Sequence, residues 1–123
     1  MSSTQDKGSL GEHIAKEFLE HLGLTYLQSN WSWKTGEIDL IFQDGDTRVF
    51  VEVRSRVATT FGEGMETVYW QKQQKLIKTA RMYQVKEDYW GNARFDVISI
   101  LLRQGKQPIV THIKDALHKF RNI

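Results

Sequence analysis

The chain has 123 residues, of which 40% are hydrophobic and 26% charged, with a net charge of +2 and no cysteine. This length suits one domain with a sizeable core, and the lack of cysteine excludes disulfides, thiolate metal sites and a cysteine nucleophile. No apolar run approaches the roughly 20 residues of a transmembrane helix, and the polar residues 1–8 lack a signal-peptide pattern. We therefore expect a cytoplasmic protein without membrane contact, whose mildly basic charge permits a nucleic-acid partner.

Residues 1–8 are expected to form a flexible tail, followed by a single domain over residues 9–123. The spacing of apolar residues predicts a first helix over residues 9–22, which Gly23 ends. Ser9 and Glu12 have the spacing of a capping box at the start of this helix. Taken alone, Glu12 is explained by the helix N-terminus that it stabilises.

Three strands are predicted next, over residues 24–33, 37–43 and 47–54, and they would form a meander. The last two alternate cleanly about a turn at Asp44-Gly45-Asp46, which is typical of a β-hairpin. One face of this hairpin is predicted to be wholly apolar and part of the core: Ile38, Leu40, Phe42, Val49, Val51 and Val53.

The opposite face of the hairpin is charged at the end far from the turn. Glu37 and Asp39 lie there on the first strand, and Glu52 and Arg54 lie there on the second. Carboxylates that face one another across a sheet are destabilising, so a bound metal ion would explain their placement. A solvated face with a Glu37–Arg54 ion pair is the alternative explanation.

Two registers are open for the hairpin. A turn at residues 45–46 places Asp39 opposite Glu52, whereas a turn at residues 44–45 places Glu37 opposite Glu52. Both registers keep the acids on one face, because side chains alternate along a strand with a period of two.

A loop over residues 57–67 leaves from the charged end of the hairpin and leads to a second helix, predicted over residues 68–87. Most lysines of this helix project outward and are explained as a solvated face. Lys72 and Gln73 differ, because they lie in the first turn near the buried face, where polar groups need a partner or a substrate.

The chain ends with an apolar strand over residues 94–103, a weaker strand over 108–112, and a short helix spaced by Ile113, Leu117 and Phe120. The link from the third strand through the second helix to the fourth strand resembles a crossover unit. The predicted fold class is therefore α/β, with a single mixed sheet of about five strands flanked by helices.

Several segments match a known pattern in order: GSLGEHIAKEFL (8–19), NW (30–31), GEIDLI (36–41), FVEVRSR (50–56), FG (61–62), KQQKLIKTA (72–80) and RFDV (94–97). On these motifs the chain resembles the YraN-like family of uncharacterised bacterial proteins, within the restriction-endonuclease-like superfamily of PD-(D/E)XK nucleases. The resemblance implies a restriction-endonuclease-like fold. It also implies a nuclease that uses Mg²⁺, or Mn²⁺ in its place, to hydrolyse phosphodiester bonds in DNA, branched or single-stranded forms included.

The resemblance also implies roles for individual residues. Asp39 and Glu52 match the paired catalytic carboxylates that hold the metal, and the carbonyl of Val53 matches a further metal ligand. Glu12 matches an acid, carried by a helix, that extends the metal site in resolvase-like relatives. Oxygen ligands of this kind suit Mg²⁺, which is commonly held by one or two carboxylates together with water and phosphate.

Around these ligands, the resemblance implies that Lys72 is a catalytic residue, that Gln73 reaches the same site, and that Glu37 supports it by orienting Arg54. Arg54 stands where the superfamily has a lysine. An arginine does not give up its proton, which excludes a general-base role, but it can bind a phosphate bidentately. Lys72 can instead supply a movable amine.

The arginine leaves alternatives to the nuclease open. One is a catalytically weak or inactive nucleic-acid-binding or adaptor module that retains the fold, and another is a protein-interaction domain. A homodimer is compatible with the sequence, although no interface pattern indicates one.

Overall fold

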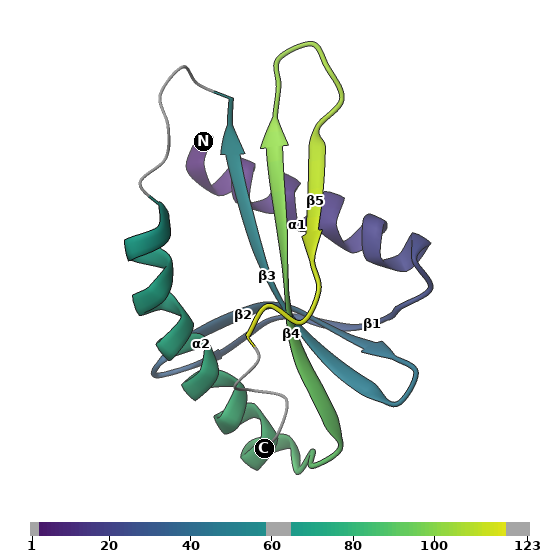
Figure 1. The fold of residues 1–123 in the computed structure, drawn as a ribbon, viewed down its shortest axis with the longest axis vertical. Coiled ribbons are helices and arrows are strands. Elements are labelled where there is room, and N and C mark those ends of the chain that lie inside the picture. The colour runs from purple at the N-terminus through teal and green to yellow at the C-terminus, as the bar shows by residue number, and fades with distance from the viewer. Residues whose placement is uncertain (1–2, 59–64, 118–123) are drawn as a thin grey trace.

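The computed structural model describes residues 3–58 and 65–117, and the side chains of residues 9–58 and 72–117. The elements follow in the order α1 (Ser3–His21), β1 (Thr25–Trp33), β2 (Gly36–Asp44), β3 (Thr47–Val57), α2 (Met65–Glu87), β4 (Asn92–Leu102) and β5 (Ile109–Ile113). The strands form one five-stranded sheet in the order β1-β2-β3-β4-β5 (Figure 1). The predicted α/β class with a single mixed sheet is confirmed.

The topology of the sheet follows the predicted connections. β1, β2 and β3 pair antiparallel as a meander, and β3 pairs parallel with β4 after the crossover through α2. β5 adds an antiparallel edge strand next to β4. In the β2–β3 hairpin Asp44 pairs with Thr47, so the turn residues are Gly45 and Asp46, and Gly45 has the positive φ of +61° that this tight turn needs. This is the first of the two predicted registers.

Each face of the sheet is covered by one helix, which gives three layers. On one face, α1 contributes Ala15 and Leu19 to a buried cluster with Leu40, Phe42, Val49, Val51 and Ile98. On the other face, α2 contributes Leu76, Ala80 and Tyr83 to a cluster with Ile38, Ile41, Phe50 and Phe95. In Figure 1, α1 passes behind the upper parts of β3, β4 and β5, and α2 runs along the left side. Neither helix, over its described residues, is long and apolar enough to cross a membrane.

The predicted apolar face of the hairpin is wrong at one residue. Ile38 is fully buried, but it packs with Ile41 on the α2 side rather than with Leu40 on the α1 side. The alternation breaks at Asp39, where the pairing of β2 with β3 ends after Leu40. Asn30, which lies on β1 beside this point, has a φ of +55°, so the strand is irregular there too.

Both ends of the chain differ from the prediction. α1 begins at Ser3, so Ser9 lies inside the helix and residues 3–8 are helical rather than a tail. The polar residues of its first turns carry no apolar periodicity, which is why the sequence pattern could not indicate them. Residues 113–117 form the end of β5 and a turn, not the start of a helix, and the rest of the predicted terminal helix lies outside the described residues.

A buried acid joins the last strand to the sheet. Asp96 of β4 is 0% exposed, and its carboxylate accepts hydrogen bonds from Arg94 (3.0 and 3.3 Å) and from the Asp115 amide (3.0 Å). His112 Nε2 of β5 lies 2.8 Å from the same carboxylate, and Arg94 also contacts Asp44 at 2.9 Å. Burial lowers the pKa of Arg94, but the carboxylates of Asp96 and Asp44 outweigh it and leave that pKa above its ordinary value.

Candidate active site

The predicted acid pair lies where the sheet divides. The pairing of β2 with β3 ends at Leu40 and Val51, directly before Asp39 and Glu52. Beyond this point β2 stays paired with β1, and β3 stays paired with β4. The Asp39 carboxylate takes the place of a backbone hydrogen-bond acceptor between the two strands, because its Oδ2 accepts a hydrogen bond from the Val53 amide at 2.7 Å. The structure thus places Asp39 and Glu52 next to one another at the open end of the hairpin.

The two carboxylates share a poorly solvated position. Burial raises the pKa of Asp39, and the neighbouring Glu52 carboxylate raises it further, to about 8, although the Val53 amide opposes the rise. Glu52 is itself only 1% exposed. The metal-free protein therefore holds the proton of Asp39 more tightly than an exposed aspartate does, and a cation bound beside it would favour its ionised form.

Glu12 and Glu37 form the outer part of the site. The Asn30 side-chain amide donates hydrogen bonds to both oxygens of Glu12, each at 3.4 Å, and to Glu37 at 3.3 Å. Ser32 donates a further hydrogen bond to Glu37 at 3.1 Å. Burial raises the pKa of Glu12, the Asn30 amide opposes the rise, and the charges of Glu37 and Glu52 add to it.

Asn30 is a site residue that sequence reasoning missed. Its amide lies between Glu12 of α1 and Glu37 of β2 and donates to both acids. Asn tolerates the left-handed φ that this position adopts, whereas most other residues are strained there. The signal in the sequence is the position of Asn30 in the NW motif, which alone does not reveal the hydrogen bonds.

The structure places the remaining predicted residues around the acid pair. Lys72 Nζ of α2 lies 2.5 Å from Glu52 Oε2, so these two residues form an ion pair. Arg54 is half-buried on β3, two residues beyond Glu52. Gln73 is half-buried beside Lys72, and no hydrogen bond joins it to the acids within the described part of the chain. The Val53 amide is engaged by Asp39, whereas a ligand role for the Val53 carbonyl stays a prediction.

The acids do not form a preassembled metal cage. Among the side chains that the structure describes, no three His, Asp or Glu groups lie close enough to hold a metal ion by themselves. Asp39 and Glu52 form the inner pair, and Glu12 lies on the outer side, held by Asn30. Glu12 as a third metal ligand therefore stays a prediction.

Gly11 sets the position of Glu12. A Cβ atom at Gly11 would lie 2.7 Å from Ser55 Cβ and 3.1 Å from Ser55 Oγ, which is closer than side chains tolerate. α1 can therefore approach β3 this closely only with glycine at the contact. This close approach brings the next residue, Glu12, to the edge of the acid site.

We expect Gly11→Ala to destabilise the protein by about 1–3 kcal/mol, because the added methyl group overlaps Ser55. Helix propensity alone predicts the opposite sign, a gain of up to about 1 kcal/mol for alanine inside a helix. Urea unfolding of Gly11→Ala, Ser55→Gly and the double variant measures the coupling between the two positions. A Gly11→Ala protein as stable as the wild type would show that α1 does not need this contact.

Comparison with known proteins assigns the chain to a family. A model of the uncharacterised protein family UPF0102 matches residues 11–100, a segment that contains Glu12, Asp39, Glu52 and Lys72. The chain belongs to this family. The predicted YraN-like membership is thus confirmed, and the observed fold is consistent with the wider restriction-endonuclease-like superfamily.

Relatives in this UPF0102 family cover most of the chain. A UPF0102 protein of Stutzerimonas stutzeri is 45% identical over 102 residues, which are 81% of this chain and 85% of the relative. One from Clostridium kluyveri is 42% identical over 117 residues, covering 94% and 96% of the two chains. One from Legionella pneumophila is 41% identical over 116 residues, covering 92% and 95%.

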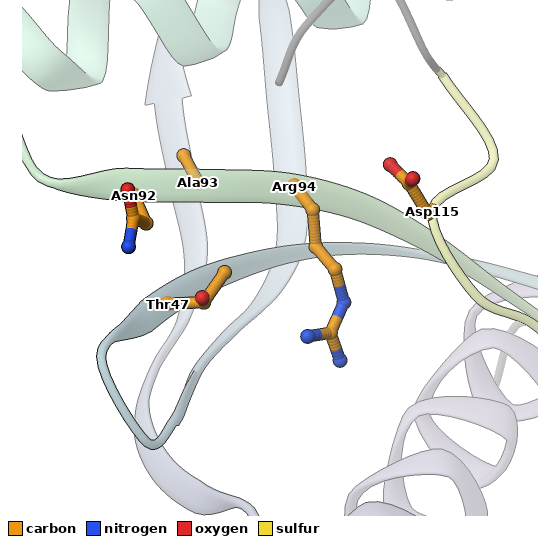
Figure 2. Close-up of a pocket in the computed structure, with 5 residues that line it drawn as sticks. All are labelled: Thr47, Asn92, Ala93, Arg94 and Asp115. Atoms are coloured by element: carbon orange, nitrogen blue, oxygen red, sulfur yellow. The ribbon is translucent and has the colours of Figure 1, made fainter. Parts of the chain in front are cut away.

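This UPF0102 protein also has a pocket away from the acids, of about 240 Å³ (Figure 2). It is lined by Thr47, Asn92, Ala93, Arg94 and Asp115, and Thr47 begins β3 at the end opposite the acid site. Figure 2 shows Arg94 and Asp115 at one side of this pocket and Thr47 and Asn92 at the other. Because the Arg94 guanidinium is already bound by Asp96 and Asp44, the pocket is best explained as a by-product of the network that fixes β5.

Proposed function

We propose that this UPF0102 protein is a Mg²⁺-dependent nuclease that hydrolyses phosphodiester bonds in DNA, with branched or single-stranded DNA as the expected substrates. The observation that carries the proposal is the acid pair of Asp39 and Glu52 where β2 and β3 separate. A fold gains no stability from two neighbouring buried carboxylates, so their placement calls for a cation.

The donor set suits Mg²⁺. Both inner ligands are carboxylates. Of the two buried Glu52 oxygens, Oε2 contacts the Lys72 ammonium, and neither accepts a hydrogen bond from a backbone amide or hydroxyl group among the described residues. Asp39 and Glu52 would hold the ion, with Glu12 and the Val53 carbonyl as further predicted ligands. Bound Mg²⁺ would supply Lewis-acid stabilisation of the charge that develops on the phosphate, and would favour ionisation of water.

The remaining residues of the site have positioning roles in this proposal. Arg54 on β3 binds the scissile phosphate through its planar guanidinium and does not act as a base. Lys72, on α2, supplies a mobile positive charge beside Glu52. Asn30 donates hydrogen bonds to Glu12 and Glu37 at the outer edge and so favours their side-by-side arrangement.

Arg54 also favours a second candidate function, a nucleic-acid-binding or adaptor module that retains the nuclease fold without the activity. The arginine removes the proton-transfer capacity that a lysine would offer at this position. Calorimetric titration with Mg²⁺ separates the two functions, because a module that has lost catalysis has no need to bind the ion.

The test of the proposed activity is a cleavage panel of duplex, single-stranded, flap and junction DNA with Mg²⁺ and with Mn²⁺. We expect cleavage of at least one form, abolished by a chelator and by Glu52→Ala. Arg54→Lys is expected to raise the rate if the arginine restrains the chemistry. No cleavage of any of these DNA forms by the folded wild-type protein would contradict the proposal and leave the binding module.

A further inference from the structure

The Glu52 carboxylate is buried at the point where β2 and β3 separate. It is 1% exposed, and no backbone amide or hydroxyl group among the described residues donates a hydrogen bond to either of its oxygens. An ionised carboxylate in such a place is costly unless a positive charge is close to it. The metal-free protein therefore needs a cation at Glu52.

The ammonium group of Lys72, which lies on α2, provides this positive charge. Its Nζ lies 2.5 Å from Glu52 Oε2, whereas 53% of the lysine side chain is exposed to solvent. A lysine ammonium is a compact charge on a flexible stem, so it can leave the carboxylate by rotating about its own bonds. The contact is thus made at the tip of a side chain whose remaining length is already in water.

We infer that Lys72 is a built-in counter-ion that occupies the cation position at Glu52, and that a divalent cation enters the site by displacing it. The inference rests on the proposed function only in taking Asp39 and Glu52 as the metal ligands. Displacement leaves the ammonium beside the site, available to the phosphate of a nucleic acid. Because coupling between two ligands is reciprocal, nucleic acid that draws Lys72 away from Glu52 raises the affinity for the metal.

The experiment compares Mn²⁺ binding by calorimetry in the wild-type protein, in Lys72→Met and in Lys75→Met. Lys72→Met is expected to bind Mn²⁺ on the order of tenfold more tightly, because the ion no longer competes with the ammonium. Lys75 is exposed on the same helix, and its replacement removes the same charge without the contact. We expect the affinity of Lys75→Met to change less than about twofold.

Thermal unfolding gives a readout independent of cleavage. Without metal, Lys72→Met is expected to unfold at a lower temperature than the wild type, because Glu52 loses its counter-ion. Saturating Mn²⁺ is expected to remove this difference. If Lys72→Met does not fold, Lys72→Gln and nitrogen-15 NMR of the wild-type Lys72 ammonium group during a Mg²⁺ titration test the same displacement.

The outcomes separate this inference from the nuclease proposal. Equal or weaker Mn²⁺ binding by Lys72→Met, or no binding by either protein, overturns the counter-ion role whatever the cleavage panel shows. Tighter binding by Lys72→Met, together with a wild-type protein that cleaves nothing, supports the counter-ion role and contradicts the nuclease.

Discussion

Replacing Asp39 with Asn is expected to abolish divalent-dependent cleavage and, at the same time, to make the metal-free protein more stable. The loss of cleavage follows from the loss of a metal carboxylate, and we expect a fall of at least about 10²–10³-fold. The gain in stability follows from removing the Asp39 carboxylate, whose ionised form is disfavoured by burial and by the charge of Glu52. A loss of cleavage together with a gain in stability distinguishes an acid kept for function from one that stabilises the fold.

The pH dependence of this gain can be derived from the pKa of Asp39, which burial and the charge of Glu52 raise to about 8. The unfolded chain releases the same proton at about pH 4. Between these two values the folded protein binds the extra proton, so its free energy of unfolding falls as the pH rises. Asn has no charge to lose and keeps an oxygen that accepts the Val53 amide. We therefore expect Asp39→Asn to be more stable than the wild type by about 1–3 kcal/mol at about pH 9, and little changed near about pH 4.

Urea unfolding across this pH range measures the effect. Asp46→Asn, which removes an exposed acid from the turn of the same hairpin, is the matched control and is expected to change stability by less than about 0.5 kcal/mol. Mg²⁺ should stabilise the wild type increasingly as the pH rises, because the ion and the proton compete for Asp39, and should stabilise Asp39→Asn much less. A loss of stability in Asp39→Asn at about pH 9 would contradict the derivation.

Replacing Asp96 with Ala is expected to cause the largest loss of stability. The substitution leaves the Arg94 guanidinium, whose side chain is 11% exposed, with Asp44 as its remaining ion-pair partner, and it removes the acceptor of the Asp115 amide. Breaking a buried charge pair in this way typically costs about 3–5 kcal/mol. For a domain of this size we expect a fall in melting temperature on the order of 10 °C or more.

Asp44→Ala is the matched control for this experiment, because it removes the other acid from the same arginine. The Asp44 side chain is 37% exposed, so its ion pair with Arg94 is worth less than about 1 kcal/mol. Differential scanning calorimetry of both variants gives the comparison. A larger loss in Asp44→Ala than in Asp96→Ala would show that the network is anchored at the surface rather than at the buried acid.

The sequence predicts the fold and the proximity of Asp39 and Glu52 because both depend on strong local patterns, whereas the role of the two acids as metal ligands stays a prediction. Alternating residues and a Gly-containing turn define the hairpin, so the proximity of Asp39 and Glu52 follows from counting residues, although the strands separate one pair earlier, at Leu40 and Val51. Apolar spacing likewise indicates both helices and the crossover between β3 and β4.

The parts that sequence reasoning missed depend on contacts between distant segments. The need for Gly11 appears only when α1 meets Ser55 of β3, and the role of Asn30 only when its amide meets Glu12. Ile38 changes sides because β2 separates from β3 at Asp39, and strict alternation cannot represent such a break. The partners of Asp96 likewise lie on β5 and in the turn after it, outside any local pattern.

The division of the sheet beside Asp39 also has a consequence for the order in which the molecule assembles. The acid pair belongs to a hairpin whose contacts are close in the chain, so little loop-closure entropy opposes its formation. Lys72 reaches Glu52 only after α2 has docked, and parallel pairing with β4 requires the same long connection. We expect the nascent hairpin to carry its acids ionised and hydrated, so that the raised pKa of Asp39 and the ion pair of Glu52 with Lys72 arise only when the helices bury the site.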